Sequence, residues 1–520
     1  MQGFFMEKKA PIWLKSKSYL HVTAQIDVQK RQHEIVSKIT NPQFVASYAF
    51  YPLLHTNLLD RKYKRDSSGT TRAHCHNEQG VFKKTAKVRP LHYATHMDAI
   101  IFTYYADVLQ TLYESQLQKD PFLHSSVTAY RRIPTDDGSN KGTIHFAKEV
   151  FEEIKAQVNN NGECSVLTFD IKSFFPSLNH DHLKRAWAKL LGVSRLPNDH
   201  FNLFKASTKF SYIYLDDLRV SKKSNKGRKA GFDEKRLAMI RNKKGINSFF
   251  ESSSEFRKAL RTGELALYKY PFRNKAGEPV GIPQGLPISA VLANLYLLEF
   301  DRTIIDAIVK TLGGFYRRYS DDIVVLCRPT DQDRIESEIV NNLKLYDLEI
   351  SSNKTEKFFF QKNNAKGIKL TKVSSTNNTV QSPLSYLGFE FDGRKMLIKS
   401  SNLSKFYRRM VSSVKKKCLR AKKIAEAQNQ NPVVFRRQLY HLYTSKQPQN
   451  KVIRKNWKKI EKKENGEFRL VTIRKEKVLR SNYLTYVRRA SEIMNEEGIN
   501  SQIKKHQRVF NRAIMKHLKK

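Results

Sequence analysis

The sequence predicts an α+β fold in which strands tipped with carboxylates are surrounded by helices. In residues 315–326 an apolar run enters and leaves a turn at Asp321 and Asp322, which predicts a β-hairpin with two adjacent acids at one end. Residues 165–169 form a second apolar strand that runs directly into Asp170, 151 positions before Asp321. Apolar residues at helical spacing predict the helices, over residues 97–117, 144–158, 183–191, 289–311 and 333–345.

The three carboxylates indicate a metal site. Two neighbouring carboxylates repel each other, and a fold keeps such a pair mainly where a divalent cation neutralises it. Together with Asp170, the pair Asp321 and Asp322 predicts a site for two Mg²⁺ ions, with Mn²⁺ as the alternative ion, that aligns a 3′-hydroxyl and a triphosphate for in-line attack. Taken alone, an Asp-Asp pair is more often a solvated turn. The flanking strands and the third acid favour the metal site, which is the chemistry of a polymerase.

Three segments resemble, in this order, motifs A, B and C of reverse transcriptases. They are Phe169-Asp170-Ile171-Lys172-Ser173-Phe174-Phe175, then Gly281-Ile282-Pro283-Gln284-Gly285-Leu286-Pro287-Ile288-Ser289, then Tyr319-Ser320-Asp321-Asp322. The resemblance extends from about residue 87 to about residue 393. The sequence around motif B, with residues 290–296 following it, is most similar to bacterial abortive-infection and defence-associated reverse transcriptases, with retron and group II intron enzymes as close relatives.

The resemblance implies a right-hand polymerase in three parts. These are an N-terminal extension over residues 1–85, fingers and a palm with an antiparallel sheet over residues 86–395, and a basic helical thumb over residues 396–520. Residues 348–355 match motif D, and residues 385–391 resemble motif E, the hairpin that grips the primer end.

The same resemblance implies roles for five further residues. Lys87 and Arg89 would bind the β- and γ-phosphates of the incoming nucleotide, and the planar fork of Arg89 suits two oxygens. Gln284 would direct its amide at the sugar or the template base. Phe175 would lie beneath the sugar and exclude a 2′-hydroxyl, and Lys354 would donate a proton to the leaving pyrophosphate. The alternatives are a solvated charge for Arg89 and Lys354, and a core aromatic for Phe175.

The charge of the chain indicates a polyanionic partner. Lys and Arg number 95 against 49 acids, a net charge of +46. Residues 401–520 carry 33 Lys or Arg and 8 Glu, a net +25, which predicts a thumb that holds duplex or structured RNA through its phosphates. Membrane lipid is the competing polyanion, but no apolar run reaches the roughly 20 residues of a spanning helix and no secretory leader is recognisable. A cytoplasmic, nucleic-acid-binding protein is therefore expected.

The cysteines, the histidines and two further segments also bear on the prediction. The four cysteines are scattered, which suits reduced thiols; residues 74–76 with His92 and His96 match no common zinc spacing. Residues 221–244, rich in Lys, Arg, Asn and Ser, predict an exposed basic loop that either contacts nucleic acid or is a plain surface insertion. The first half of residues 1–85 has helical spacing, and residues 60–80 are loop-like.

We therefore expect an RNA-directed DNA polymerase that copies a dedicated non-coding RNA into cDNA from dNTPs, in bacterial antiphage defence. A retron or intron-type reverse transcriptase, template-independent or protein-primed DNA synthesis, and a non-enzymatic RNA-binding protein are the alternatives. The intact set of three acids argues against a pure binder. The template, the type of primer and a possible homo-oligomer are left open by the sequence.

Overall fold

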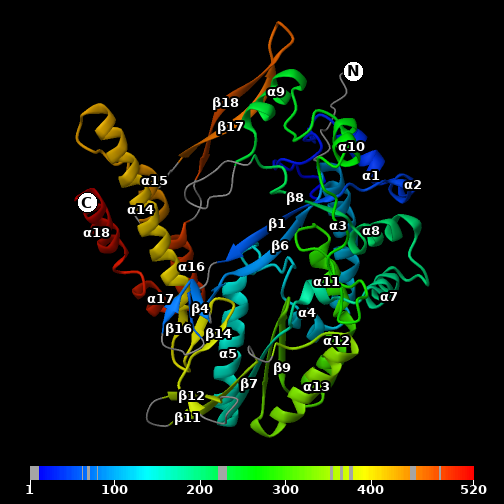
Figure 1. The fold of residues 1–520 in the computed structure, drawn as a ribbon. Helices are drawn as coiled ribbons and strands as arrows, with labels where there is room; N and C mark the ends of the chain where they lie inside the picture. The colour runs from blue at the N-terminus through cyan, green and yellow to red at the C-terminus, as the bar shows by residue number, and fades with distance from the viewer. Residues whose placement is uncertain are drawn as a thin grey trace, which may run out of the picture.

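A six-stranded antiparallel sheet forms the lower part of the molecule in Figure 1. The computed structural model describes residues 11–60, 63–66, 71–78, 80–220, 231–351, 355–363, 367–373, 379–444, 452–478 and 482–519. We call the six-stranded sheet the palm sheet. Its strand order is β13-β12-β11-β7-β10-β9. The strands are β7 (Glu163–Asp170), β9 (Phe315–Tyr319), β10 (Asp322–Cys327), β11 (Glu356–Asn363), β12 (Gly367–Val373) and β13 (Thr379–Val380). The hairpin and the acid-tipped strand expected from the sequence are thus β9–β10 and β7.

Both faces of the palm sheet are buried. Successive side chains of a strand point to opposite faces, so Leu167 and Phe169 of β7 join one apolar cluster while Cys164 and Val166 join another. The first cluster includes residues of α3 (His96–Gln118), α7 (His180–Leu191), α8 (Asn198–Thr208), α11 (Ser289–Tyr296), α12 (Leu298–Ile304) and α13 (Gln332–Leu345). The second includes residues of α5 (Thr143–Asn161), the C-terminal helices and a small sheet of β14 (Leu384–Tyr386), β15 (Phe389–Phe391) and β16 (Met396–Ile398).

These elements confirm the predicted α+β fold. The expected helices are present within a few residues, except that residues 289–311 form three pieces: α11, α12 and a π-helical segment, Ile305–Lys310. Among the described residues, no helix is both long and apolar enough to cross a membrane.

A second sheet forms the core of the fingers. In it β6 (Lys87–Tyr93) pairs antiparallel with β1 (Leu53–Asp60), which pairs parallel with β8 (Tyr212–Tyr214). β1 belongs to the predicted N-terminal extension, yet it shares this sheet with two later strands; a boundary at residue 85 stays a prediction. The extension also contributes α1 (Gln32–Ile39), α2 (Pro42–Ser47), β2 (Lys64–Arg65), β3 (Arg72–Ala73), β4 (Cys75–Glu78) and β5 (Val81–Lys84); α4 (Pro121–Ser126) follows α3.

The insertion between motifs A and B is partly helical, so the loop predicted over residues 221–244 is wrong for its second half. Residues 234–244 form α9 (Glu234–Lys244), and α10 (Ser253–Arg261) follows. The Asp233 side chain caps the first turn of α9, and Gly245, with φ +65°, ends it. Leu237 packs with Leu54 of β1 and Ile213 of β8, which fixes α9 to the fingers. Residues 221–230 lie outside the described residues.

The C-terminal region is helical, with one exception that the sequence analysis missed. Its helices are α14 (Ser400–Gln428), α15 (Arg437–Tyr443), α16 (Tyr483–Met494), α17 (Glu497–Ser501) and α18 (His506–Lys519). Between α15 and α16 the chain forms a two-stranded antiparallel ribbon of β17 (Val452–Lys462) and β18 (Phe468–Val478). We call this ribbon, with its turn at residues 463–467, the arm.

Candidate active site

Asp170 and Asp322 are brought together by the palm sheet. They are the terminal pair in the register of β7 and β10, directly opposite each other. Asp170 lies on the same face as Val166 and Asp322 on the same face as Val324, so both acids share the face that carries the second apolar cluster. Directly opposite like charges destabilise a sheet. A cation between them removes that penalty, and paired carboxylates are the hard oxygen donors that Mg²⁺ prefers.

Asp321 adds a third carboxylate from the turn. Ser320 takes the left-handed conformation, with φ 61°, and so allows the two-residue turn between β9 and β10. The Asp321 carbonyl accepts a hydrogen bond from the Ile171 amide at 3.0 Å, which ties the turn to the end of β7. Burial, and then the charge of Asp170, raise the pKa of Asp321 above its usual value, while Lys87 acts in the opposite direction. Asp170, Asp321 and Lys87 are therefore electrostatic neighbours.

The three carboxylates are the type of donor that binds a divalent ion, but they do not yet surround one position. Among the described residues, no three acidic, His or Cys side chains already stand in metal-binding geometry. A site that Mg²⁺ occupies together with substrate phosphates needs only one or two protein carboxylates. The assignment of Asp170, Asp321 and Asp322 as ligands stays a prediction.

The hairpin rests on a buried ion pair that the sequence analysis did not find. Arg318 of β9 and Asp301 of α12 are both fully buried, and two guanidinium nitrogens donate to the two Asp301 oxygens at 2.8 and 2.6 Å. The Tyr316 hydroxyl also donates to Asp301 at 2.7 Å. A further Arg318 nitrogen reaches the Ser320 carbonyl at 3.2 Å, so this network holds the turn directly. The signal that could have predicted this pair is Arg318 itself, a charged residue at an inward-facing position of an apolar strand.

Tyr130 contacts the same turn from the opposite side. Its hydroxyl lies 3.1 Å from the Ser320 hydroxyl, and its backbone has φ 61°, unusual for an aromatic residue. The carbonyl of Arg318 accepts from the amide and the hydroxyl of Thr128, at 3.0 and 3.1 Å. This segment therefore covers the free edge of β9. Nothing in the spacing of residues 127–130 predicts that contact.

The motif B loop is held by backbone contacts that only glycine permits. Gly281 has φ +84°, and a Cβ there would lie 2.4 Å from the Pro176 carbonyl oxygen. Gly285 has φ +117°, and a Cβ there would lie 2.4 Å from the His92 carbonyl oxygen. Gln284 is half-buried, and its carbonyl accepts from the His92 amide at 2.8 Å. The loop is thus fixed between motif A and β6, with the Gln284 side chain still to be assigned by experiment.

The two predicted phosphate-binding residues lie on β6, the edge strand of the fingers sheet. Lys87 is exposed and its charge acts on Asp321. Arg89 lies on the same strand and forms an ion pair of 3.7 Å with Asp60 of β1. Asp60 also lies 3.9 Å from Lys405 of α14. Lys87 is therefore grouped with the acids, whereas Arg89 is paired with a carboxylate of the fingers.

Phe175 lies at the end of motif A. The strand β7 ends at Asp170 itself, and α6 (Phe174–Ser177) follows after a left-handed Ser173 with φ 50°. Phe174 is buried in the first apolar cluster, while Phe175 is only partly buried, with its ring 5.6 Å from that of Phe174. The Phe175 carbonyl accepts from the Ile282 amide at 2.8 Å, joining motifs A and B.

Lys354 lies outside the described residues. The preceding part of motif D does reach the site, because Ser351 donates its amide to the Asp170 carbonyl at 2.8 Å and Lys172 donates to the Glu349 carbonyl at 2.8 Å.

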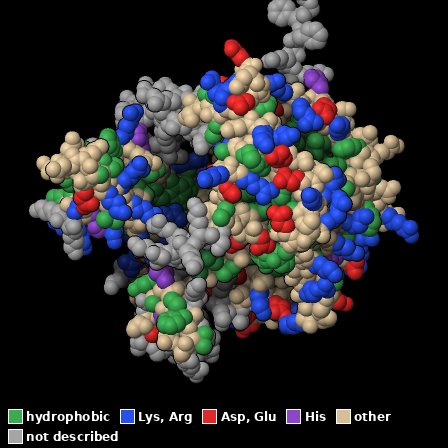
Figure 2. All heavy atoms as spheres, turned by 45° about the horizontal axis from the view of Figure 1, so that its top comes forward, with side chains coloured by type: hydrophobic (Ala, Val, Ile, Leu, Met, Phe, Trp, Pro, Cys, Tyr) green, Lys and Arg blue, Asp and Glu red, His purple; other side chains and the backbone are tan. Residues whose placement is uncertain are grey.

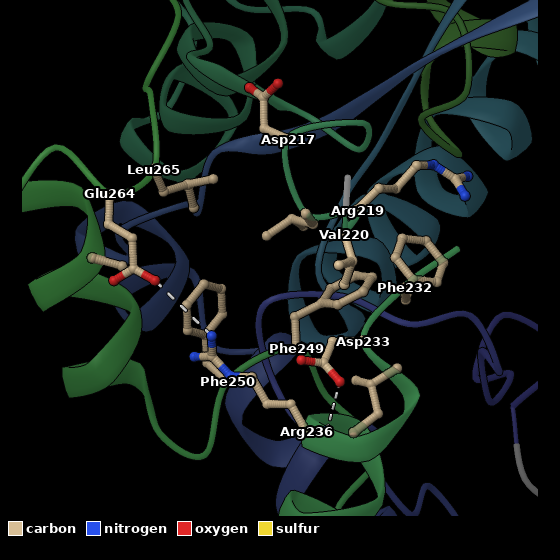
Figure 3. A pocket seen from close by; sticks show the side chains of 13 residues that line it. Asp217, Arg219, Val220, Phe232, Asp233, Arg236, Phe249, Phe250, Glu264 and Leu265 are labelled. Carbon is tan, nitrogen blue, oxygen red and sulfur yellow. Dashed lines mark hydrogen bonds and ion pairs between the residues drawn. The ribbon is translucent and has the colours of Figure 1, made fainter. Parts of the chain in front are cut away.

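A separate cavity of about 190 Å³ lies in the insertion between motifs A and B, and Asp170, Asp321 and Asp322 do not line it (Figure 3). Its lining mixes charges and aromatic rings, including Asp217, Arg219, Asp233 and Phe232. Arg236 donates to Glu255 at 2.8 Å and lies 4.0 Å from Glu264, so carboxylates at this cavity have basic partners. The cavity shares no residue with the palm site.

Residues 250–391 match the family model of reverse transcriptase (RNA-dependent DNA polymerase). The match includes motifs B, C and E and ends before the thumb; Asp170 lies upstream of it. It confirms the predicted enzyme class, RNA-directed DNA polymerase, and it does not test the bacterial defence subtype. No curated protein matches the chain.

Solved telomerase structures from two yeasts are similar to the chain. Apo telomerase from Candida tropicalis, truncated from its C-terminal domain, has 12% identity and a TM-score of 0.36, covering 61% of this chain and 54% of that one. Telomerase from Candida albicans in complex with a TWJ fragment of telomeric RNA has 12% identity and a TM-score of 0.36, covering 72% of this chain and 52% of that one. The chain thus spans about half the length of these structures.

Proposed function

We propose that this chain, which carries a reverse transcriptase domain, adds deoxynucleotides to a primer end on an RNA template. The observation that carries the proposal is the direct opposition of Asp170 and Asp322, with Asp321 in the adjoining turn. Two divalent ions bound by these acids would activate the 3′-hydroxyl and neutralise charge on the phosphates. In the reaction, the 3′-oxygen forms a bond to the α-phosphorus, the bond from that phosphorus to the bridging oxygen breaks, and pyrophosphate leaves.

The remaining residues of the site would orient the nucleotide. The charge of Lys87 acts on Asp321, which supports a role for this cation in holding the triphosphate. Arg89 would join it only after giving up Asp60, because one guanidinium cannot serve both partners at full strength. Gln284 lies on the motif B loop and Phe175 in α6, and the Ile282 amide donates to the Phe175 carbonyl, so sugar and base contacts would be set by one unit.

The template is proposed to be a dedicated non-coding RNA, and the setting bacterial antiphage defence in the cytoplasm. The support is the resemblance of residues 290–296 and the basic C-terminal region. Sequencing the nucleic acid that co-purifies with the protein tests the template. Plaque assays on cells carrying the wild type or Asp321→Asn test the role, since a defence function through DNA synthesis requires the variant to lose protection.

A primer-extension assay with Mg²⁺ and labelled dNTPs tests the chemistry. The expected result is extension only when RNA template and primer are both present. Extension without added RNA from nucleic-acid-free protein would indicate template-independent synthesis, and label that remains on protein after nuclease treatment would indicate a protein primer. RNA binding without any incorporation would favour a pure binder.

A further inference from the structure

The arm reaches across from the thumb to the fingers and ends on α9. Figure 1 shows it, in orange, leaving the C-terminal helices and ending beside α9, with β1 and β6 below. The Phe468 ring, at the start of β18, lies against Gly245, where an added Cβ would be 2.6 Å from two ring carbons. With its nitrogen turned toward the arm, the Asn242 side chain donates to the Phe468 carbonyl at 3.2 Å and to the Ala238 carbonyl at 3.3 Å.

The elements that the arm connects, α9 on one side and α15 and α16 on the other, each pack in an apolar core. α9 is fixed to the fingers through Leu237, which packs with Leu54 and Ile213. The arm leaves α15 and returns into α16, whose Leu439 and Leu484 are buried with Val324 of the palm sheet. The chain therefore forms a closed ring of palm, fingers, α9, arm and thumb. Among the described residues, the arm meets α9 through Phe468 and Asn242, whereas palm, fingers and thumb are joined to one another through buried apolar clusters.

The space inside the ring suits a polyanion. Figure 2 shows the molecule hollowed between the main body and a smaller lobe, the C-terminal helices at left in both views, with Lys and Arg side chains at the rim. The two strands of the arm carry nine Lys or Arg against two Glu. Its tip differs: residues 461–467 hold three Glu and two Lys, while the last turn of α9 is basic, with Arg241, Lys243 and Lys244. Two of these Glu pair within the arm, Glu467 with Lys463 at 3.1 Å and Glu461 with Arg469 at 3.9 Å, so the contact with α9 depends on Phe468 rather than on charge. The excess of Lys and Arg in the arm as a whole suits a polyanion.

We propose that the arm is a clasp that encircles the RNA template and its primer strand, opening at Phe468 to admit them. The closed path of the chain is held at this point by the Phe468 side chain against Gly245 and by one side-chain hydrogen bond, a contact weak enough to open. Once closed, it prevents the bound RNA from leaving sideways. The inference rests on the proposed function for the identity of the occupant. It adds a binding surface that none of the polymerase motifs contains.

A crosslink across the joint tests the clasp. Lys244 and Glu467 are exposed neighbours of the two contacting residues, so Lys244→Cys with Glu467→Cys in a Cys75→Ser background leaves Phe468 and Gly245 unchanged. Cys75 is the exposed native cysteine. A short bismaleimide is added after binding of a primed RNA circle or of the same primed RNA in linear form. Washing in high salt then removes contacts that depend on phosphate charge.

The expected result is that the crosslinked protein retains the circle and loses the linear RNA. Crosslinking before RNA is added should abolish extension on the circle and preserve it on the linear RNA, which can thread. Each single-cysteine protein, treated alike, should lose both RNAs.

Two outcomes would overturn the clasp. One is loss of the circle along with the linear RNA after crosslinking. The other is failure of the crosslink to form although both cysteines react with a maleimide dye, which would mean that the tip does not meet α9. Normal extension by the untreated protein in either case leaves the proposed function standing, whereas absence of extension in the untreated protein counts against that function itself.

Discussion

Asp170 and Asp322 face each other across the last pair of the β7–β10 ladder. Both carboxylates lie at the same end of two neighbouring strands, and the five residues that follow Asp322 in β10 are all buried and apolar. Like charges directly opposite each other in a sheet are destabilising. A bound divalent cation would offset this repulsion, which links metal binding to stability.

Asp170→Asn and Asp321→Asn should each abolish dNTP incorporation with little loss of fold, because they remove a ligand charge and keep the side-chain shape. Mg²⁺ should raise the Tm of the wild type and have little effect on the Asp170→Asn variant. Radiolabelled incorporation and thermal melts measure both effects. Asp306→Asn, at a carboxylate that is 65% exposed, is the matched control. Near-normal incorporation by both site variants would remove the two-metal assignment.

Asp301→Ala should destabilise the protein by about 3–5 kcal/mol, because it leaves the Arg318 charge buried without its partner. The hairpin turn should loosen at the same time, since Arg318 also holds the Ser320 carbonyl. Denaturant unfolding, together with limited proteolysis near residue 320, measures both.

The triple variant Asp301→Leu with Arg318→Met and Tyr316→Phe should recover much of that loss, because it replaces the pair by apolar groups and also removes the Tyr316 hydroxyl that donates to Asp301. Glu34→Ala, which breaks the exposed pair with Arg31, is the control and should change stability far less. If Asp301→Ala were no worse than Glu34→Ala, the buried pair would not support the hairpin.

Charge reversal of Arg408 and Arg409 should flatten the salt dependence of RNA binding. Both side chains are exposed on α14, in the basic C-terminal region. If each contacts a phosphate, the slope of log affinity against log salt should fall by up to about 2 in magnitude. Filter binding across a salt series measures it. Arg334→Glu with Lys344→Glu on α13, the same change in charge, should leave the slope nearly unaltered. Equal slopes for the wild type and the α14 variant would exclude these two residues from the contact surface.

The sequence predicted the elements of the palm because their patterns are local. An apolar strand that ends in an acid, a hairpin around two Asp, and long helices at a 3.6-residue period are all visible in one stretch of chain. Local patterns do not predict which of the acids lie directly opposite each other in the sheet. The pairing of Asp170 with Asp322 is a matter of register between strands 152 positions apart, set by the packing of both faces.

The strands of the arm were missed because their many charged residues obscure the alternating pattern of a β-strand. Lys and Arg interrupt the alternation of β17 and β18, so the region was interpreted as part of a helical thumb. Asn465-Gly466 between two stretches with Val, Ile and Trp was the local indication of a turn, and Gly466 has φ +82° there. The Arg318–Asp301 pair and the Tyr130 contact join residues from different elements, and no periodicity of a single segment reports them.

Phe175→Ala should raise the use of rNTPs while dNTP use stays largely intact. The two aromatic residues of motif A differ in burial: Phe174 is 3% exposed in the core, whereas Phe175, also in α6, is only partly buried and accepts the Ile282 amide of motif B through its carbonyl. The part of the Phe175 ring that the core does not cover is available to meet a sugar. Discrimination against a 2′-hydroxyl needs only a few kcal/mol, since about 1.4 kcal/mol corresponds to tenfold.

The measurement is kcat/KM for dATP and rATP on one template, in the wild type, Phe175→Ala and Phe174→Leu. Phe174→Leu is the matched control, because it perturbs the core and should lower both rates together without changing their ratio. A steric gate at Phe175 requires the ratio to shift toward rATP in Phe175→Ala alone. Should both variants lower the two rates in parallel, Phe175 acts through packing as Phe174 does, and the choice of sugar must be made by other residues, with Gln284 on the adjoining loop as the next to test.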